Sequence, residues 1–461
     1  MDLSDRRNDA FTSLSVPRAV SYMVIPAIIS QIIHVVYNLA DTWFVGLTGD
    51  PNAVAAISLC LPVYNILTGL SNLFGVGGAS VIARAAGYGD KEKAKRAFAV
   101  SVWAAFLSAL FYSVLLLFLE KPVLLLIGGD EGDISFAVQY SFVTIVLGGV
   151  PTVLSATFSN LIRAHGESRK AAAGITIGAV INILLDPLFM FVLLSPGHEV
   201  LGAALATAVS NLASLIYFFV FLIREQDEIY GFTPFLIKQS RLLLEDIMRS
   251  GAPGFIMVAL AMLSNCFLNA MISSYGGGAA MAGLGIVRKI DSLAYAVNQG
   301  ITQGMLPLVA YCYASGRHSR MKHIIAFSTA CTVSFSLVCS ALSYLFAPQL
   351  IDLFIDDRQT ILYGAEFMRV LCLAIPIYSI TFVLIAAFQG VGRSTSALIL
   401  SLLHKGSLDI LLLFLFRMLF GVYYVIWATP VTEFIAMAVG IILLVLFLRE
   451  RERPNIKEVI Q

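Results

Sequence analysis

The chain has 461 residues, of which 58% are hydrophobic and only 13% are charged. Because about a quarter of the residues of an ordinary soluble domain are charged, this composition excludes a soluble globular protein and predicts a protein that uses a lipid bilayer as its solvent. The formal net charge of +1 argues against a nucleic-acid partner.

Twelve apolar stretches recur along the chain. Each is long enough to cross the roughly 30 Å hydrocarbon core of a bilayer as a helix, which satisfies every backbone polar group internally. The predicted fold class is therefore all-α, a polytopic membrane protein with twelve transmembrane helices. The stretches lie near residues 19–46, 53–83, 97–119, 134–161, 171–194, 200–223, 251–275, 279–313, 324–346, 361–388, 395–416 and 421–448.

The distribution of basic residues over the connecting loops predicts the orientation. One set of alternate loops and the termini hold 23 Lys and Arg residues, among them Arg163 after the fourth span. The opposite loops hold only Lys121, Arg358 and Arg417. Since basic loops stay on the cytoplasmic side, we expect both termini to be cytoplasmic.

The longest polar interruption, residues 224–250, divides six spans from six. We predict a first lobe at residues 1–225, a cytoplasmic linker at 226–250 and a second lobe at 251–461. A shift of 227 residues without a gap supports this division, because it aligns Pro26 with Pro253 and Asn38 with Asn265. Each half has an even number of spans, so the repeats share one topology, a plan known among transporters.

Two carboxylates lie inside the predicted spans of the first lobe. Ionisable groups there cost roughly 2.5 to 3.5 kcal/mol each, which makes them functional candidates. Asp41 and Asp186 both fall in the outer half of the bilayer, Asn182 precedes Asp186 by one helical turn, and Thr207 returns to a similar depth. These four residues could surround one pocket of oxygen ligands for Na⁺ or a proton. The alternative is a buried hydrogen-bond network that only joins helices.

Three further residues of the first span could support this pocket. His34 and Asn38 share a helical face with Asp41, at i, i+4 and i+7 spacing. Packing is the alternative role for His34. Pro26 interrupts the same helix and frees a carbonyl, so it is either a passive kink or a hinge.

The second lobe contains acids and bases in balance, which favours a structural polar network. We expect Lys405 and Asp409 to pair directly at i, i+4 spacing. A substrate role for an acid of this network is the alternative. The network comprises Arg288, Lys289, Asp291, Lys405, Asp409 and Glu433.

No catalytic or nucleotide-binding motif is recognisable. The sequence lacks HExxH, GxSxG, a P-loop and a dinucleotide fingerprint, so we expect neither an enzyme nor a bound cofactor. Energy for transport would come from an ion gradient.

Several ordered motifs resemble one known family. Residues 37–46 (YNLADTWFVG), 75–80 (GVGGAS) and 87–90 (GYGD) are similar to the first repeat of multidrug and toxic compound extrusion (MATE) transporters, and residues 299–304 and 311–316 are similar to the second. The resemblance implies two six-helix lobes that form a V around a central cavity. It also implies cation-coupled export of amphipathic, often cationic, compounds.

The resemblance also carries over to the site. In archaeal and related bacterial members the cation site uses an Asp on the first helix, an Asn and an Asp four residues apart on the fifth, and a Thr on the sixth. Asp41, Asn182, Asp186 and Thr207 match these positions. Other members have a Glu on the seventh helix, but residues 252–275 contain no acid here. The resemblance therefore favours coupling in the first lobe.

These observations predict an antiporter in the cytoplasmic membrane of a prokaryote. It would export small organic molecules in exchange for H⁺ or Na⁺, and we expect a monomer. Tyr37 and Met257 are candidates for substrate contact, with packing as the alternative. A flippase for lipid-linked saccharides is the alternative function, which unpaired arginines in the cavity would favour. A non-transporting scaffold would leave the paired acids unexplained.

Overall fold

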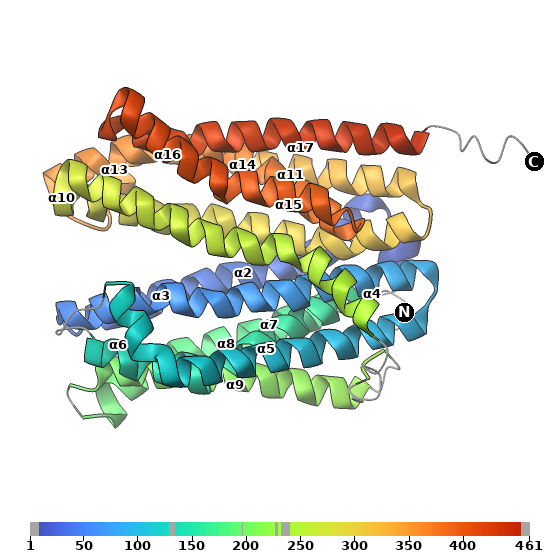
Figure 1. The fold of residues 1–461 in the computed structure, drawn as a ribbon, viewed down its shortest axis with the longest axis horizontal. Coiled ribbons are helices and arrows are strands. Elements are labelled where there is room, and N and C mark those ends of the chain that lie inside the picture. The colour runs from blue at the N-terminus through green and yellow to red at the C-terminus, as the bar shows by residue number, and fades with distance from the viewer. Residues whose placement is uncertain (1–8, 129–133, 196, 226–228, 232–239, 453–461) are drawn as a thin grey trace, which may run out of the picture.

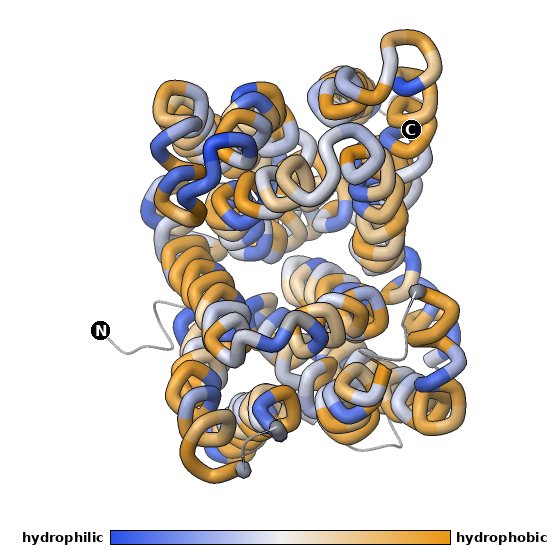
Figure 2. Tube along the Cα trace, turned by 90° about the vertical axis from the view of Figure 1, so that its left-hand side faces the viewer, coloured by the Kyte–Doolittle hydropathy of each residue, from blue (hydrophilic) through white to orange (hydrophobic). Residues whose placement is uncertain are grey.

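The computed structural model describes residues 9–128, 134–195, 197–225, 229–231 and 240–452. Regular secondary structure in these ranges is helical. Large apolar side chains point outward in many places; Leu126, for example, is 89% exposed and Met418 80% exposed. Figure 2, in which the helices are seen from their ends, shows hydrophobic residues in most of them. Such a surface is suited to lipid, because a soluble protein rarely exposes apolar patches of this extent.

The first lobe consists of the helices from α2 to α9. Their loops supply N-caps: the Asp50 and Asp90 side chains accept hydrogen bonds from the backbone N–H groups of Asn52 and Lys93. The helices are α2 (Val16–Gly46), α3 (Pro51–Ser71), η1 (Asn72–Val76), α4 (Gly77–Tyr88), α5 (Lys91–Leu126), α6 (Ile134–Ser141), η2 (Phe142–Leu147), α7 (Gly149–Ala164), α8 (Ser168–Leu188), η3 (Phe189–Leu193) and α9 (Glu199–Glu225).

The second lobe consists of the helices from α10 to α17. They are α10 (Arg241–Ala314), α11 (His318–Leu345), α12 (Ala347–Asp352), α13 (Arg358–Leu371), α14 (Ala374–Gly390), α15 (Ser394–Lys405), α16 (Ser407–Phe420), η5 (Val422–Trp427) and α17 (Ala428–Glu452). Helix α10 begins within the expected linker 226–250, whose residues 226–228 and 232–239 lie outside the described ranges.

The structure agrees with twelve membrane spans. Nine helices of the described chain are long and apolar enough to cross a bilayer, and the count is eleven when the bent pairs Ile134–Leu147 with Gly149–Ala164 and Arg358–Leu371 with Ala374–Gly390 are each one span. Helix α10 is 74 residues long and breaks at Gly276 and Gly277. Gly277 has φ +56° and ψ −142°, a conformation that glycine adopts readily because it has no Cβ. Dividing α10 there gives the twelfth span.

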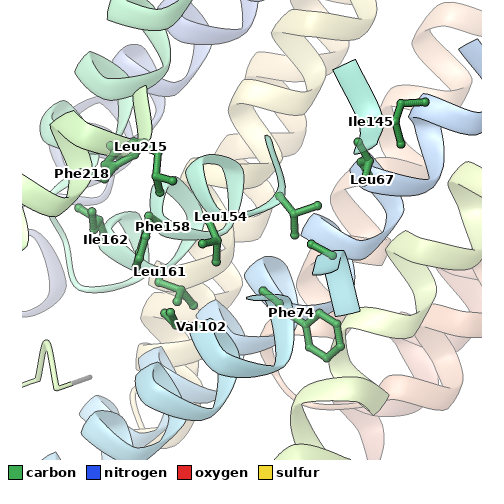
Figure 3. Packing of buried hydrophobic residues seen from close by; sticks show 14 of the residues in the cluster. Leu67, Phe74, Val102, Ile145, Leu154, Phe158, Leu161, Ile162, Leu215 and Phe218 are labelled. Atoms are coloured by element: carbon green, nitrogen blue, oxygen red, sulfur yellow. The ribbon is translucent and has the colours of Figure 1, made fainter. Parts of the chain in front are cut away.

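The two lobes lie one against the other, with the first half of the chain in the lower lobe of Figure 1 and the second half in the upper lobe. We call the end of the molecule at which α2 begins the inner end, and the opposite end the outer end. The first lobe packs around aromatic rings such as Phe158, which lies near Phe218 (Figure 3). The Phe98 ring stacks on Phe158 as well. The long α10 carries the chain from beside α4 at the inner end into the second lobe (Figure 1).

The lobes meet closely in the inner half of the molecule, and glycines allow this contact. A Cβ on Gly300 of α10 would lie 2.6 Å from the Ile28 Cα of α2, and one on Gly304 would lie 2.8 Å from the Val24 Cα. Small residues four apart allow two membrane helices to approach at backbone distance. We call this contact between α2 and α10 the glycine seam.

Hydrogen bonds reinforce the inner contact between the lobes. Arg84 of α4 is an ion-pair partner of Asp246 of α10 at 3.0 Å, and the Ser80 hydroxyl donates to the backbone carbonyl of Gln389, 2.5 Å away. Arg163 of α7 donates to Gln303 of α10 at 2.9 Å. Arg163 is only 2% exposed and belongs to the last turn of α7, so its assignment to the connecting loop was wrong. At the inner end of α7 it contacts the facing lobe through Gln303.

A small cavity remains between the lobes at this level. Its volume is about 60 Å³, and amide side chains such as Asn72, Asn160 and Gln303 line it together with Met257. A ligand pocket for a drug-sized molecule measures roughly 300–1,000 Å³. This cavity is therefore too small for such a molecule in the present conformation, and the inner half is closed.

Candidate ion-binding site in the first lobe

Three of the four predicted site residues meet between α8 and α9. Asn182 and Asp186 lie one turn apart on α8, and the Asn182 amide nitrogen is 3.3 Å from Asp186 Oδ1 and 3.5 Å from Thr207 Oγ1 of α9. All three are buried, with Asp186 at 0% exposure. Gly178 lets these helices approach, because a Cβ there would overlap the Ser214 hydroxyl of α9. The spacing on α8 therefore directs both polar side chains at α9.

Asp41 approaches the same group from α2. It is half-buried, and its charge interacts with that of Asp186. Neither carboxylate forms an ion pair with a residue in the described ranges. The structure thus places all four predicted residues in one region, with two acids and no basic partner.

Three buried oxygens of this group lack a hydrogen-bond donor in the structure: Asp41 Oδ1, Asn182 Oδ1 and Asp186 Oδ2. A buried acceptor without a partner costs roughly 1–3 kcal/mol. A proton between the carboxylates, or a hard cation that takes oxygen ligands, would satisfy these atoms. The donor set therefore fits H⁺ or Na⁺.

Tyrosines that the sequence analysis did not place at the site surround Asp41. Tyr37, Tyr64 and Tyr140 all interact with the Asp41 charge. Tyr64 also hydrogen-bonds with Thr152 of α7. Aromatic residues are common in apolar spans, so the sequence held no signal that would single out Tyr64 and Tyr140. Tyr37 was expected as a possible substrate contact, and it lies beside the acids.

The three supporting residues have different surroundings. Asn38 donates through its side-chain amide to the backbone carbonyl of His34, 2.8 Å away, on its own helix. The His34 ring packs edge-on against Tyr37, with centroids 4.8 Å apart. Pro26 lies inside α2, as predicted, below the acids and beside the glycine seam. No described contact joins His34 or Asn38 to the Asp41 side chain.

The contacts within the second-lobe network differ from those predicted. Lys405 ends α15, and the non-helical Gly406 separates it from Asp409 on α16, so the i, i+4 register is broken. The expected Lys405–Asp409 pair is therefore wrong. Lys405 Nζ instead lies 4.0 Å from Glu433 Oε1. Asp409 accepts hydrogen bonds from the hydroxyls of Ser264 and Thr432.

The remaining members of the network are less tightly connected. Asp291 accepts a hydrogen bond from the Tyr378 hydroxyl at 3.0 Å. Arg288 donates to the side-chain oxygen of Asn269 at 2.7 Å and leaves Nη2 without a partner. Lys289 is exposed and forms no ion pair within the described part of the chain.

His404 is a network residue that the sequence analysis missed. Its Nδ1 lies 2.5 Å from Glu433 Oε2, and both side chains are almost fully buried, at 1% and 0% exposure. Its position in an apolar span next to Lys405 was the available signal. Glu433 thus has two basic neighbours, in contrast to the acids of the first lobe.

Two six-helix lobes of equivalent topology, one of them with a buried acidic pocket, follow a plan that is known among membrane transporters. The MatE family model matches residues 26–188 and again residues 253–415. Both boundaries of the second match are displaced by 227 residues from the first, which confirms the repeat found in the sequence. The chain belongs to the MatE family of transporters, and the predicted family and fold are confirmed.

Relatives of known name cover the whole chain. It is 28% identical to the multidrug export protein MepA of Staphylococcus saprophyticus, over 97% of this chain and 98% of that protein. It is 27% identical to MepA of Staphylococcus aureus strain NCTC 8325, over the full length of both. Its fold matches the outward-facing conformation of a multidrug resistance MATE family transporter of the MOP superfamily, with a TM-score of 0.89, 23% identity and coverage of 96% of this chain and 98% of that one.

Proposed function

We propose that this protein is a multidrug exporter that moves small amphipathic, often cationic, organic compounds out of the cell in exchange for H⁺ or Na⁺. It would work as a monomer in the cytoplasmic membrane, with both termini in the cytoplasm. The observation that carries the coupling proposal is the cluster of Asp41, Asn182, Asp186 and Thr207. The names of the MepA relatives support the choice of substrates.

The coupling proposal follows from the lack of basic partners. Burial disfavours a charged carboxylate, and a second acid nearby disfavours it further, so such a pair binds a proton or a cation. The driving force is about 2.3 kcal/mol per charge for each 100 mV, plus any concentration term. Asp41 is on α2, the helix that forms the glycine seam with α10. Ion binding can therefore change the helix on which the contact between the lobes depends.

The direction of access fits export. The glycine seam and the Arg84–Asp246 ion pair close the inner half, while the acids lie further toward the outer end along α2. In the proposed cycle, an ion from outside binds the acids while the inner half is closed. Its binding would favour release of substrate outward and the return of the lobes to the inward-open state, as alternating access requires.

Efflux from proteoliposomes tests the proposal. Ethidium, a fluorescent organic cation, should leave the vesicles when a proton or Na⁺ gradient is imposed, and separate gradients identify the coupling ion. Asp41→Asn and Asp186→Asn should each abolish gradient-driven efflux while retaining expression, because the amide keeps the size of the side chain and loses its titratable group. Glu92→Gln, at an exposed position of α5, is the matched control and should transport as wild type.

Two results would contradict the proposal. Wild-type efflux by Asp41→Asn and Asp186→Asn at equal protein amounts would remove the acids from coupling. Failure of the wild-type protein to move organic cations, together with translocation of a lipid-linked saccharide, would establish the flippase alternative.

A further inference from the structure

A groove of about 720 Å³ lies on the flank of the first lobe, between the inner halves of α2 and α8. It is separate from the cavity between the lobes. On α2 its wall includes Ile25 and Ile29, which are 53% and 49% exposed, whereas Met23 and Val24 on the opposite face are buried against the second lobe. The groove therefore opens sideways, toward the region that lipid occupies.

The groove has a polar end and an apolar end. Arg18, in the first turn of α2, and Arg169, in the first turn of α8, lie at its inner end. Ile25, Ile29 and Ala173 line it further toward the middle of the membrane. At 1.5 Å per helical residue, the eleven steps along the helix from Arg18 to Ile29 span about 16 Å. That length matches one leaflet, about half of the 30 Å hydrocarbon core.

The two arginines are available to a ligand. Neither forms an ion pair with a carboxylate among the residues that the structure describes, and both are exposed. The Arg169 guanidinium lies 5.5 Å from the Tyr22 ring centroid, which holds the charge at the edge of the groove. Glu167, the nearest acid along the chain, interacts with Tyr217 of α9. The groove therefore has two cationic side chains at its inner end, and an apolar channel extends from them toward the middle of the membrane.

We propose that this groove binds an anionic phospholipid of the inner leaflet. The lipid phosphate lies between Arg18 and Arg169, and one acyl chain follows α2 past Ile25 to Ile29. The charge pattern selects an anionic lipid over a zwitterionic one, whose own cationic group would be repelled by the two arginines. The hydroxyl of Ser168, which donates to the Met23 backbone carbonyl at 2.6 Å, fixes the start of α8 against α2 and so fixes the width of the groove.

Native mass spectrometry and thermal unfolding of the purified protein test this site. The probes are phosphatidylglycerol, phosphatidylcholine and inorganic phosphate, each added to detergent-solubilised full-length protein. Wild type should retain phosphatidylglycerol in preference to phosphatidylcholine and should unfold at a higher temperature in its presence. Arg18→Gln and Arg169→Gln should each weaken phosphatidylglycerol binding about fivefold, from roughly 1 kcal/mol of attraction per basic residue. The matched control is Arg449→Gln, at an exposed position at the inner end of α17.

Each possible result decides the proposal. Loss of phosphatidylglycerol in the two groove variants, but not in Arg449→Gln, supports the site. Equal loss in all three variants would indicate general charge attraction and would overturn it. Equal retention of both lipids by wild type, or stabilisation by inorganic phosphate alone to the same extent, would overturn it too. Ala173→Phe gives a second check, since a ring that fills the apolar channel should displace the lipid while both arginines remain.

Discussion

The glycine seam sets the stability of the closed inner half, and Gly300→Ala should disturb it. The new Cβ would lie 2.6 Å from the Ile28 Cα, whereas ordinary contact begins near 3.4 Å, so α2 would have to withdraw by about 0.8 Å. Overpacking of this kind costs roughly 1–3 kcal/mol. A penalty of that size on the state that is closed at the inner end shifts the equilibrium between the closed and the open state about 5- to 150-fold. Gly300→Ala should therefore populate the state that is open at the inner end.

Cysteine accessibility measures this shift. Asn72→Cys, in a background without the six native cysteines, places a thiol in the small cavity between the lobes. Labelling by a thiol reagent from the inner side should be at least several-fold faster with Gly300→Ala. Gly285→Ala is the matched control: it lies on the same helix, gains the same helix propensity, and its Cβ meets nothing within 4 Å. Equal labelling rates in the two variants would refute the reasoning.

Three other predictions follow from the site and the topology. Thr207→Ala should reduce gradient-driven efflux less than either acid substitution, because one neutral oxygen is lost; an equal loss would indicate a structural role for the hydroxyl. Asp409→Asn should lower the unfolding temperature, since the amide has one acceptor oxygen for two hydroxyl donors, yet drug-induced ion movement should survive; uncoupled transport would move the ion site to the second lobe. A cysteine at His198 should react with an impermeant reagent from outside the cell and one at Lys93 should not, and reversed labelling would invert the proposed orientation.

The fold was predictable because its main determinants are periodic. The length of the apolar stretches predicted the spans, and the alignment at a shift of 227 residues predicted an internal repeat, which the two family matches reproduce. Regularity also explains why the i, i+4 pair on α8 was placed correctly: Asn182 and Asp186 sit on an unbroken helix. The same rule failed at Lys405 and Asp409, because Gly406 interrupts the helix between them.

Contacts between helices were less accessible to sequence reasoning. Arg163 looked like a loop cation because it stands near the polar end of a span, but it is buried against Gln303 of the other lobe. His404 lies in an apolar run, and only the packing of α15 against α17 brings it to Glu433. Tyr64 and Tyr140, whose charges interact with that of Asp41, were missed for the same reason. The depth of a helix in the membrane and its rotation about its own axis depend on the helices that pack against it. The spacing of residues along one helix does not encode that packing.

The parallel repeat bears on how such a protein can arise. A single copy with six spans begins and ends on one side of the membrane, so it would insert in one orientation and could pair with itself around a two-fold axis along the membrane normal. Gene fusion would then release the copies from having identical sequences. The two copies in the present chain differ in their ionisable groups: among the residues that the structure describes, Asp41 and Asp186 have no basic partner, while Glu433 lies next to His404 and Lys405. A symmetric dimer of identical half-length chains would carry two equal sites, whereas the two copies in this chain are chemically distinct.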